Sequence, residues 1–272
     1  MSGLLLVRYA RVGWALLFAA AALALGAAGV LAHANAVRSA PAADAVVIDA
    51  PGETAVWFDE AVDLSQSAIK LLDRSGQMLV EGRGSRTGER NAVGVAVPPL
   101  GPGTYTAVWQ NVAADDGHAN SGYYSFSVGR PDPALSVSPA SDNRTGSRGT
   151  IALSITPQDD GRHRFEVTAV DSRGAPVGDV QRVILRARMQ DPAAGPATVD
   201  AVLNGSGQYT ATAGLLGVPG RYELEVVVRQ RRAQDWSAKF ALQAAPPGAA
   251  GAPAVAPTAP QPTTDSDSAN AQ

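Results

Sequence analysis

Two histidines of this chain stand in settings that suit a metal ion. His33 directly follows Val30-Leu31-Ala32, which reads as a signal-peptidase site, so cleavage after Ala32 would make His33 the mature N-terminus. An N-terminal histidine offers a metal both its free α-amine and its imidazole. His118 ends the segment Asp115-Asp116-Gly117-His118, where one glycine separates a carboxylate from an imidazole. Together these nitrogen and oxygen donors indicate a Cu(II) site.

The N-terminal segment predicts export. Arg8 and Arg11 precede an apolar run from Trp14 to Leu31, so residues 1–32 are expected to be a cleaved signal peptide and the mature protein to be periplasmic or otherwise extracytoplasmic. The alternative is an uncleaved signal anchor, because the run approaches the roughly 20 residues that span a bilayer. In that case the chain would contact the membrane, and the amide nitrogen of His33 could no longer chelate a metal.

Composition narrows both the partners and the metal. Without residues 1–32, 20 basic and 25 acidic residues leave a formal charge of −5, which argues against nucleic acid as a partner. The chain has no cysteine, so thiolate metal sites are excluded and the fold must be stabilised by burial alone. Met1 would be lost with the signal peptide, and Met78 and Met189 are isolated, so no methionine-rich Cu(I) site can form.

The pattern of strand-forming segments predicts an all-β protein with two consecutive antiparallel β-sandwich domains of Greek-key or immunoglobulin-like type. The first domain, residues 33–129, has five such segments: 54–58, 68–72, 92–97, 104–112 and 123–128. The second domain, residues 150–243, has seven: 151–156, 164–170, 182–188, 197–203, 208–213, 220–229 and 236–241. A Pro- and Ser-containing linker is expected over 130–149, and a disordered Pro/Ala-rich tail over 244–272.

Ordered motifs of the first domain resemble the periplasmic CopC-type copper resistance family. In chain order they are His33-Ala34, Ser39–Ala45, Val56–Val62, Leu72–Gly76, Leu100–Tyr105 and Trp109–Gly122. The second domain more loosely resembles YtkA-like β-sandwich domains, through Pro157–Gly161, Gly207-Gln208-Tyr209 and Pro219–Tyr222.

The resemblance to the CopC-type family implies a ligand set and a function. His33 would supply its amine and one imidazole nitrogen, His118 a second imidazole and Asp116 a carboxylate oxygen, while Glu60 would bond to a ligand rather than to the metal. Asp115 stands where the family commonly has a small polar residue, and it could compete with Asp116 as the ligand. The implied function is non-enzymatic: copper buffering, resistance and homeostasis, or copper delivery to an inner-membrane CopD-type transporter.

Two other functions stay open from the sequence. An amine and two imidazoles also form the histidine brace of lytic polysaccharide monooxygenases, so a copper-dependent oxidoreductase is one alternative. A carboxylate from Asp116 would occupy an equatorial position and favour Cu(II), and this favours binding over turnover. The other alternative is an adhesion or scaffold protein whose working part is the second domain and whose metal binding is incidental.

Four further features carry structural expectations only. His163, between Arg162 and Arg164, is expected on a solvated strand edge without a metal role. Trp57 and Trp109 are expected to fill the core of the first domain, one from each sheet. The basic cluster at 229–232 is expected to be an exposed turn.

Overall fold

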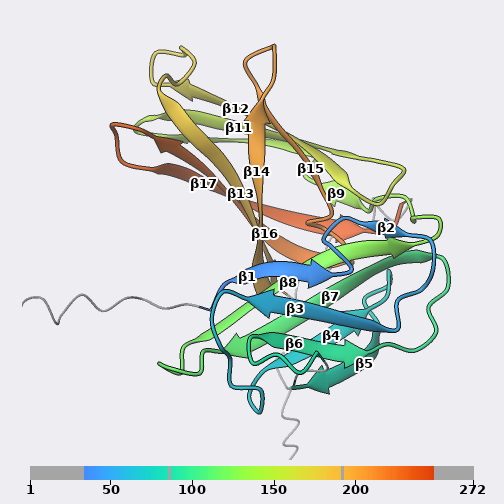
Figure 1. Ribbon diagram of the computed structural model, residues 1–272. Helices are drawn as coiled ribbons and strands as arrows, with labels where there is room; N and C mark the ends of the chain where they lie inside the picture. The colour runs from blue at the N-terminus through green and yellow to red at the C-terminus, as the bar shows by residue number, and fades with distance from the viewer. Residues whose placement is uncertain (1–33, 85–86, 191–192, 248–272) are drawn as a thin grey trace, which may run out of the picture.

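A computed structural model describes residues 34–84, 87–190 and 193–247 of the 272-residue chain. The regular elements of these ranges are all β-strands, and the described part of the chain contains no helix long and apolar enough to cross a membrane. The strands form three sheets in two stacked modules, and their pairing is antiparallel except between β2 and β8 (Figure 1). The expected all-β sandwich fold is confirmed.

The first module packs a three-stranded sheet against a five-stranded sheet. The smaller sheet has the order β1 (Ala36–Ala40), β3 (Glu53–Phe58), β6 (Ala92–Ala96). The larger has the order β2 (Val46–Val47), β8 (Ala119–Val128), β7 (Gly103–Val112), β4 (Ala68–Leu72), β5 (Met78–Arg83). Alternate residues of each strand point inward, and Phe58 of β3 meets Trp109 of β7 edge-to-face with ring centroids 5.2 Å apart.

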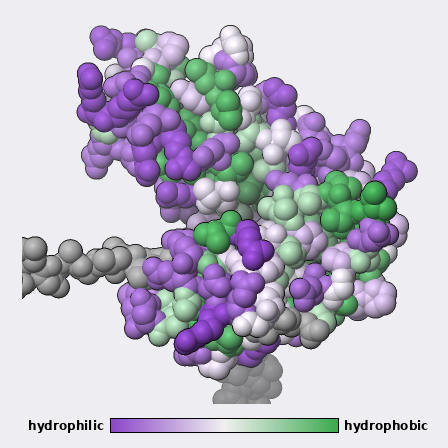
Figure 2. Space-filling view, viewed as in Figure 1, coloured by the Kyte–Doolittle hydropathy of each residue, from purple (hydrophilic) through white to green (hydrophobic). Residues whose placement is uncertain are grey.

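The second module is a nine-stranded ladder that folds back on itself. Its order is β10 (Ser141–Gly146), β11 (Gly149–Pro157), β12 (His163–Asp171), β15 (Tyr209–Ala213), β14 (Ala193–Leu203), β13 (Val180–Gln190), β16 (Gly220–Gln230), β17 (Trp236–Ala245), β9 (Ser136–Ser138). The ladder turns at β14, which pairs with β13 along most of its length and with β15 only at Val202 and Leu203. The core between its two layers includes Phe165, Leu185 and Phe240. Hydrophilic side chains cover much of the outer surface of this module on the face seen in Figure 2.

The segment expected to be a linker contributes structure to the second module. Residues 136–138 form β9, which pairs with β17, and residues 141–146 form β10, which pairs with β11. Leu135 is buried in the core of that module. Ala244 and Ala245, expected to belong to the tail, are the last residues of β17, and the expected tail beyond residue 247 lies outside the described residues. The domain boundaries at 129 and 150 stay predictions.

The second module packs on the outer face of the larger sheet of the first. Tyr124 and Phe126 of β8 point into the first module, so Tyr123 and Ser125 point outward. The Tyr123 hydroxyl lies 2.9 Å from the carbonyl oxygen of Leu215 and 3.1 Å from that of Ala187. β8 and β14 accordingly lie against each other, and the two modules share a continuous buried contact.

The two tryptophans divide between the sheets as expected, but only Trp109 lies in the central core of the first module. Val56 and Phe58 face that core, so Trp57 lies on the opposite face of β3. There the Arg38 guanidinium covers its ring at 3.5 Å, and its indole nitrogen donates to Glu89 at 2.9 Å. Trp57 is thus buried as expected, at 7% exposure, but in a separate small cluster with Ala55 and Ala92 rather than in the central core, and charged side chains cover it on the outer face.

Candidate metal centre

The loop between β7 and β8 carries two of the predicted metal ligands. Val112 pairs with Ala119 at the end of the hairpin, and the amide of Ala113 donates to the carbonyl of His118 at 2.9 Å. Gly117, at φ 72°, donates its amide to the Ala113 carbonyl at 3.1 Å. This left-handed conformation favours glycine and turns the chain back sharply. The turn therefore brings Asp116 and His118 to the same side of the loop.

Asp116 and His118 form a direct pair. One carboxylate oxygen of Asp116 accepts from the backbone amide of His118 at 3.0 Å, and the other lies 2.7 Å from His118 Nδ1. The imidazole side chain is 54% exposed and the carboxylate 28%. The pair is thus held by the backbone yet open to solvent, as a site that exchanges a metal ion requires.

The N-terminal end of the described chain is fixed beside this hairpin. Ala34 is 2% exposed, and its carbonyl accepts from the Asn111 side chain at 2.9 Å. Asn111 lies in β7, one residue before Val112. The next residue, Asn35, donates its backbone amide to Asp59 Oδ1 at 2.6 Å. These two anchors fix Ala34 and Asn35, the first described residues, at the end of the sandwich where Asp116 and His118 lie.

His33 itself lies outside the described residues, so its predicted ligation is not observed. The single side-chain oxygen of Asn111, Oδ1, is buried and has no hydrogen-bond partner within the described ranges. In the described part of the chain, no three potential ligands are grouped.

Glu60 lies on a loop that adjoins the candidate ligands. This half-buried residue precedes Ala61, whose carbonyl accepts from the Ala114 amide at 3.0 Å. Asp115 is exposed in the same hairpin loop, and its carboxylate accepts the backbone amide of Asp116 at 2.8 Å. The Asp115 carboxylate is thus used within the loop, whereas that of Asp116 is directed at His118.

Sequence reasoning missed the residues that anchor the N-terminal segment. Asn111 and Asp59 hold Ala34 and Asn35 through hydrogen bonds that span 77 and 24 residues of sequence. Asn111 is 1% exposed, which is unusual for an amide side chain. A buried polar residue in an apolar strand was the one signal available, since such a residue needs a partner.

His163 is in a different environment from the one expected. It is fully buried at the start of β12, and its Nε2 lies 2.8 Å from the Leu135 carbonyl. Its Nδ1 has no hydrogen-bond partner among the described residues. Burial lowers the pKa of His163 below its ordinary value. The prediction of a solvated edge is wrong, because alternation along the strand places His163 with Phe165 on the core face.

These observations define a class of protein: a two-module β-sandwich with an exposed imidazole–carboxylate pair at one end of the first module. Residues 36–129 match the family model described as the CopC domain. Protein YobA of Escherichia coli K12 is 34% identical over 102 residues, which cover 36% of this chain and 81% of YobA. YobA of Shigella flexneri gives the same values. The chain belongs to the CopC domain family.

Two solved structures are also similar to part of this chain. CopC from Methylosinus trichosporium OB3b is 28% identical, and the alignment covers 38% of this chain and 100% of that protein with a TM-score of 0.34. PcoC, a methionine-rich copper resistance protein from Escherichia coli, is 26% identical, with 36% and 99% covered and a TM-score of 0.30.

Proposed function

We propose that this chain is an extracytoplasmic Cu(II)-binding protein whose ligands are the amine and imidazole of His33, the imidazole of His118 and a carboxylate oxygen of Asp116. The Asp116–His118 pair is the observation that carries the proposal. Membership of the CopC domain family supports it, since related proteins are named for copper resistance. Glu60 is proposed to bond to one of the ligands from the adjoining loop.

The spacing of the pair suits a chelate. Two ligands about 2 Å from one ion and at right angles to each other lie about 2.8 Å apart. Asp116 Oδ2 and His118 Nδ1 are 2.7 Å apart, so little movement would be needed for both to bind in adjacent equatorial positions. If the metal instead binds Nε2, the same contact fixes the ring and its tautomer. Asp116 therefore contributes to either arrangement.

We propose binding and transfer of copper rather than catalysis. A carboxylate ligand from Asp116 would favour Cu(II) over Cu(I) and would fill a coordination position that oxygen chemistry needs open. The proposed role is copper buffering or resistance, with delivery to a membrane transporter of CopD type as the proposed destination. The mature chain would be exported, with cleavage after Ala32, because an N-terminal His33 is required for the amine ligand.

A metal titration tests the proposal. The chain beginning at His33 should bind one Cu(II) far more tightly than Zn(II) or, under a reductant, Cu(I). His118→Ala should weaken Cu(II) binding by about 100-fold or more. Asp116→Ala should weaken it by about 10-fold or more. One residue added before His33 should also weaken binding strongly. Asp200→Ala is the matched control, because Asp200 is an exposed carboxylate of the second module that pairs only with Arg182 in the described residues.

Two results would contradict this function. Equal Cu(II) affinity with and without the added residue would remove His33 from the ligand set. Many-turnover oxidation of a polysaccharide by the copper protein with a reductant and peroxide, abolished by Asp116→Ala, would replace the binder with the oxidoreductase alternative.

A further inference from the structure

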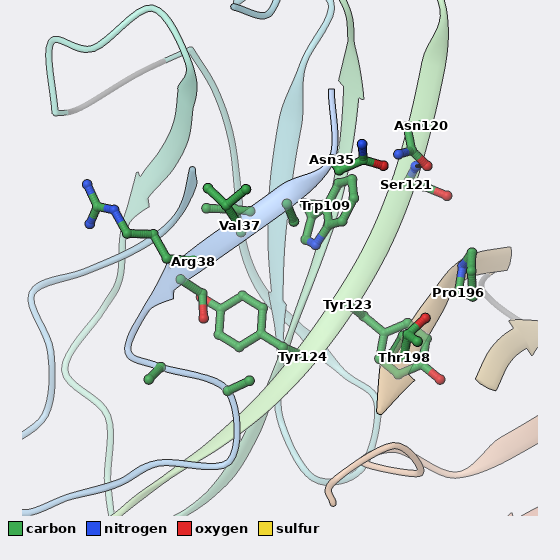
Figure 3. Close-up of a pocket in the computed structure, with 16 residues that line it drawn as sticks. Asn35, Val37, Arg38, Trp109, Asn120, Ser121, Tyr123, Tyr124, Pro196 and Thr198 are labelled. Carbon is green, nitrogen blue, oxygen red and sulfur yellow. Dashed lines mark hydrogen bonds between the residues drawn. The ribbon is translucent and has the colours of Figure 1, made fainter. Parts of the chain in front are cut away.

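A cleft of about 780 Å³ lies between the two modules. Asn35 and strand β1, through Ala36–Ser39, form one wall (Figure 3). Strand β8 forms another through Asn120, Ser121, Tyr123 and Tyr124. Pro196–Thr198 of β14 close the cleft from the second module. Asn35 and Asn120, each two residues from a predicted copper ligand, lie at the same end of the cleft in Figure 3. The cleft therefore begins beside the candidate metal centre.

Both strands that flank the cleft are sheet edges. β1 pairs only with β3 among the described strands, and its Val37 side chain is 60% exposed. β8 pairs with β2 only at Ser127 and Val128, so the part from Ala119 to Tyr124 has no strand on that side within the described ranges. In the first module, the β1 edge of the smaller sheet and the β8 edge of the larger sheet thus both lack a neighbouring strand beside the cleft.

The backbone groups on the open edge of β8 can be assigned from the alternation of the strand. The Ser125 carbonyl accepts from Asp44, and the Ser127 amide donates to Ala45, so residues 125 and 127 face away from β7. Ser121 and Tyr123 are also odd-numbered residues of this strand, so their backbone amide and carbonyl groups point away from β7 as well, toward the cleft. The amide of Ser121 donates to the side chain of its neighbour Asn120 at 2.9 Å, a substitute for a ladder partner.

The shape of the cleft suits a single extended strand. β1 and β8 both run away from the metal end, and at the far end the Tyr124 hydroxyl lies 3.3 Å from the Ala40 carbonyl. Tyr124 thereby joins the two walls and closes that end. At about 3.3 Å per residue, the space from Asn35 to Ala40 would hold about five residues of a guest strand.

Charge complementarity further defines the guest. Arg38 is the one charged residue that lines the cleft, and its side chain points away from it in Figure 3. The Arg38 guanidinium instead stacks on Trp57. Asp59, Asp115 and Asp116 give the open end a concentration of carboxylates. A guest that fits would have small uncharged side chains within the cleft and a cationic side chain at the metal end.

We propose that this cleft binds an extended segment of a partner protein, which adds as a strand to the open edges of β1 and β8. Main-chain hydrogen bonds to such edges give affinity, and the alternating side chains give specificity. The occupant we infer is a neutral strand with a lysine or arginine next to the candidate metal centre. This docking does not depend on copper, so it can be tested on the metal-free protein.

A probe peptide and amide chemical shifts test the docking. The probe is an acetylated and amidated peptide of about seven residues, with lysine first and serine or threonine alternating with valine after it. Added to the ¹⁵N-labelled chain beginning at His33, it should shift the amides of Ser121 and Tyr123 saturably. The same peptide with methylated valine nitrogens should bind at least about tenfold more weakly, because it cannot complete the ladder.

A pair of variants locates the binding. Val37→Arg places a bulky cation in the cleft and should weaken binding of the probe peptide by about tenfold or more. Val202→Arg is the control, because Val202 is 70% exposed outside the cleft. The proposal is overturned by equal binding of the methylated peptide, by an unaffected Val37→Arg variant, or by no saturable shift. Shifts that follow protein concentration without the probe would instead assign the cleft to a second copy of this chain. Loss of copper binding with probe binding retained would refute only the proposed function.

Discussion

Among the described glycines at the contact between the two modules, Gly217 leaves the least room for a Cβ atom, and its replacement by alanine should weaken the docking of the modules. A Cβ atom at this position would lie 2.2 Å from Ser125 Oγ and 2.4 Å from Thr106 Oγ1. Both hydroxyls are buried, lie 3.0 Å from each other, and the Ser125 hydroxyl also donates to the Gly214 carbonyl at 3.1 Å. Overpacking costs about 1–3 kcal/mol, and each lost hydrogen bond adds about 1 kcal/mol. Gly217→Ala should therefore cost about 2–5 kcal/mol.

Denaturant unfolding followed by tryptophan fluorescence measures this loss. Trp57 and Trp109 report on the first module and Trp236 on the second, so weaker docking should also separate the two transitions. Gly205→Ala is the control, because nothing lies within 4 Å of its Cβ position.

A second background sharpens the test of Gly217. In a protein that already carries Ser125→Ala and Thr106→Ala, both clashing hydroxyls are absent, so Gly217→Ala should cost much less than it does alone. The close-approach argument is refuted if Gly217→Ala destabilises no more than Gly205→Ala, or if the two hydroxyl deletions leave its cost unchanged.

Two further predictions concern a buried base and a covered tryptophan. Burial lowers the pKa of His163, so below about pH 6.5 the unfolded chain binds a proton that the folded chain does not. The free energy of unfolding should therefore decrease as the pH falls below that value. His163→Gln should reduce this pH dependence, measured by urea unfolding between about pH 7 and pH 5. An unchanged slope of unfolding free energy against pH would contradict the prediction. Arg38→Ala should cost about 1 kcal/mol and red-shift the fluorescence of Trp57, because the guanidinium covers its ring; an unchanged spectrum would show that the stacking does not persist in solution.

The strands found by sequence pattern are those whose side chains enter a core. β3, β4 and β7 are rich in apolar and aromatic residues, and their positions follow from that pattern. β10, with the sequence Ser-Asp-Asn-Arg-Thr-Gly, is almost wholly exposed and contains residues that strands avoid. It is a strand because β11 supplies a complete ladder beside it, and such tertiary pairing leaves no trace in local propensity.

His163 and Trp57, whose surroundings differ from those predicted, show how alternation along a strand decides whether a side chain faces the core. His163 was assigned to solvent from the arginines beside it, although neighbours in a strand point to opposite faces. Residues two positions away are the informative ones, and Phe165 and Val167 are both buried. Trp57 is the converse case. Its neighbours Val56 and Phe58 face the core, so the same rule places Trp57 outside, where Arg38 and Glu89 cover it.

The candidate metal centre combines a local signal with a distant one. Asp116 and His118 could be paired from sequence, because a single glycine at positive φ is enough to bring their side chains together. The position of the N-terminal segment could not, because it depends on Asn111 reaching Ala34 across 77 residues. A long-range contact of this kind is fixed by the register of β7 against β8 and by the path of β1. Since β1 begins at Ala36 and is also the wall of the cleft, the same few hydrogen bonds that fix the metal end also set the edge on which a guest strand would dock.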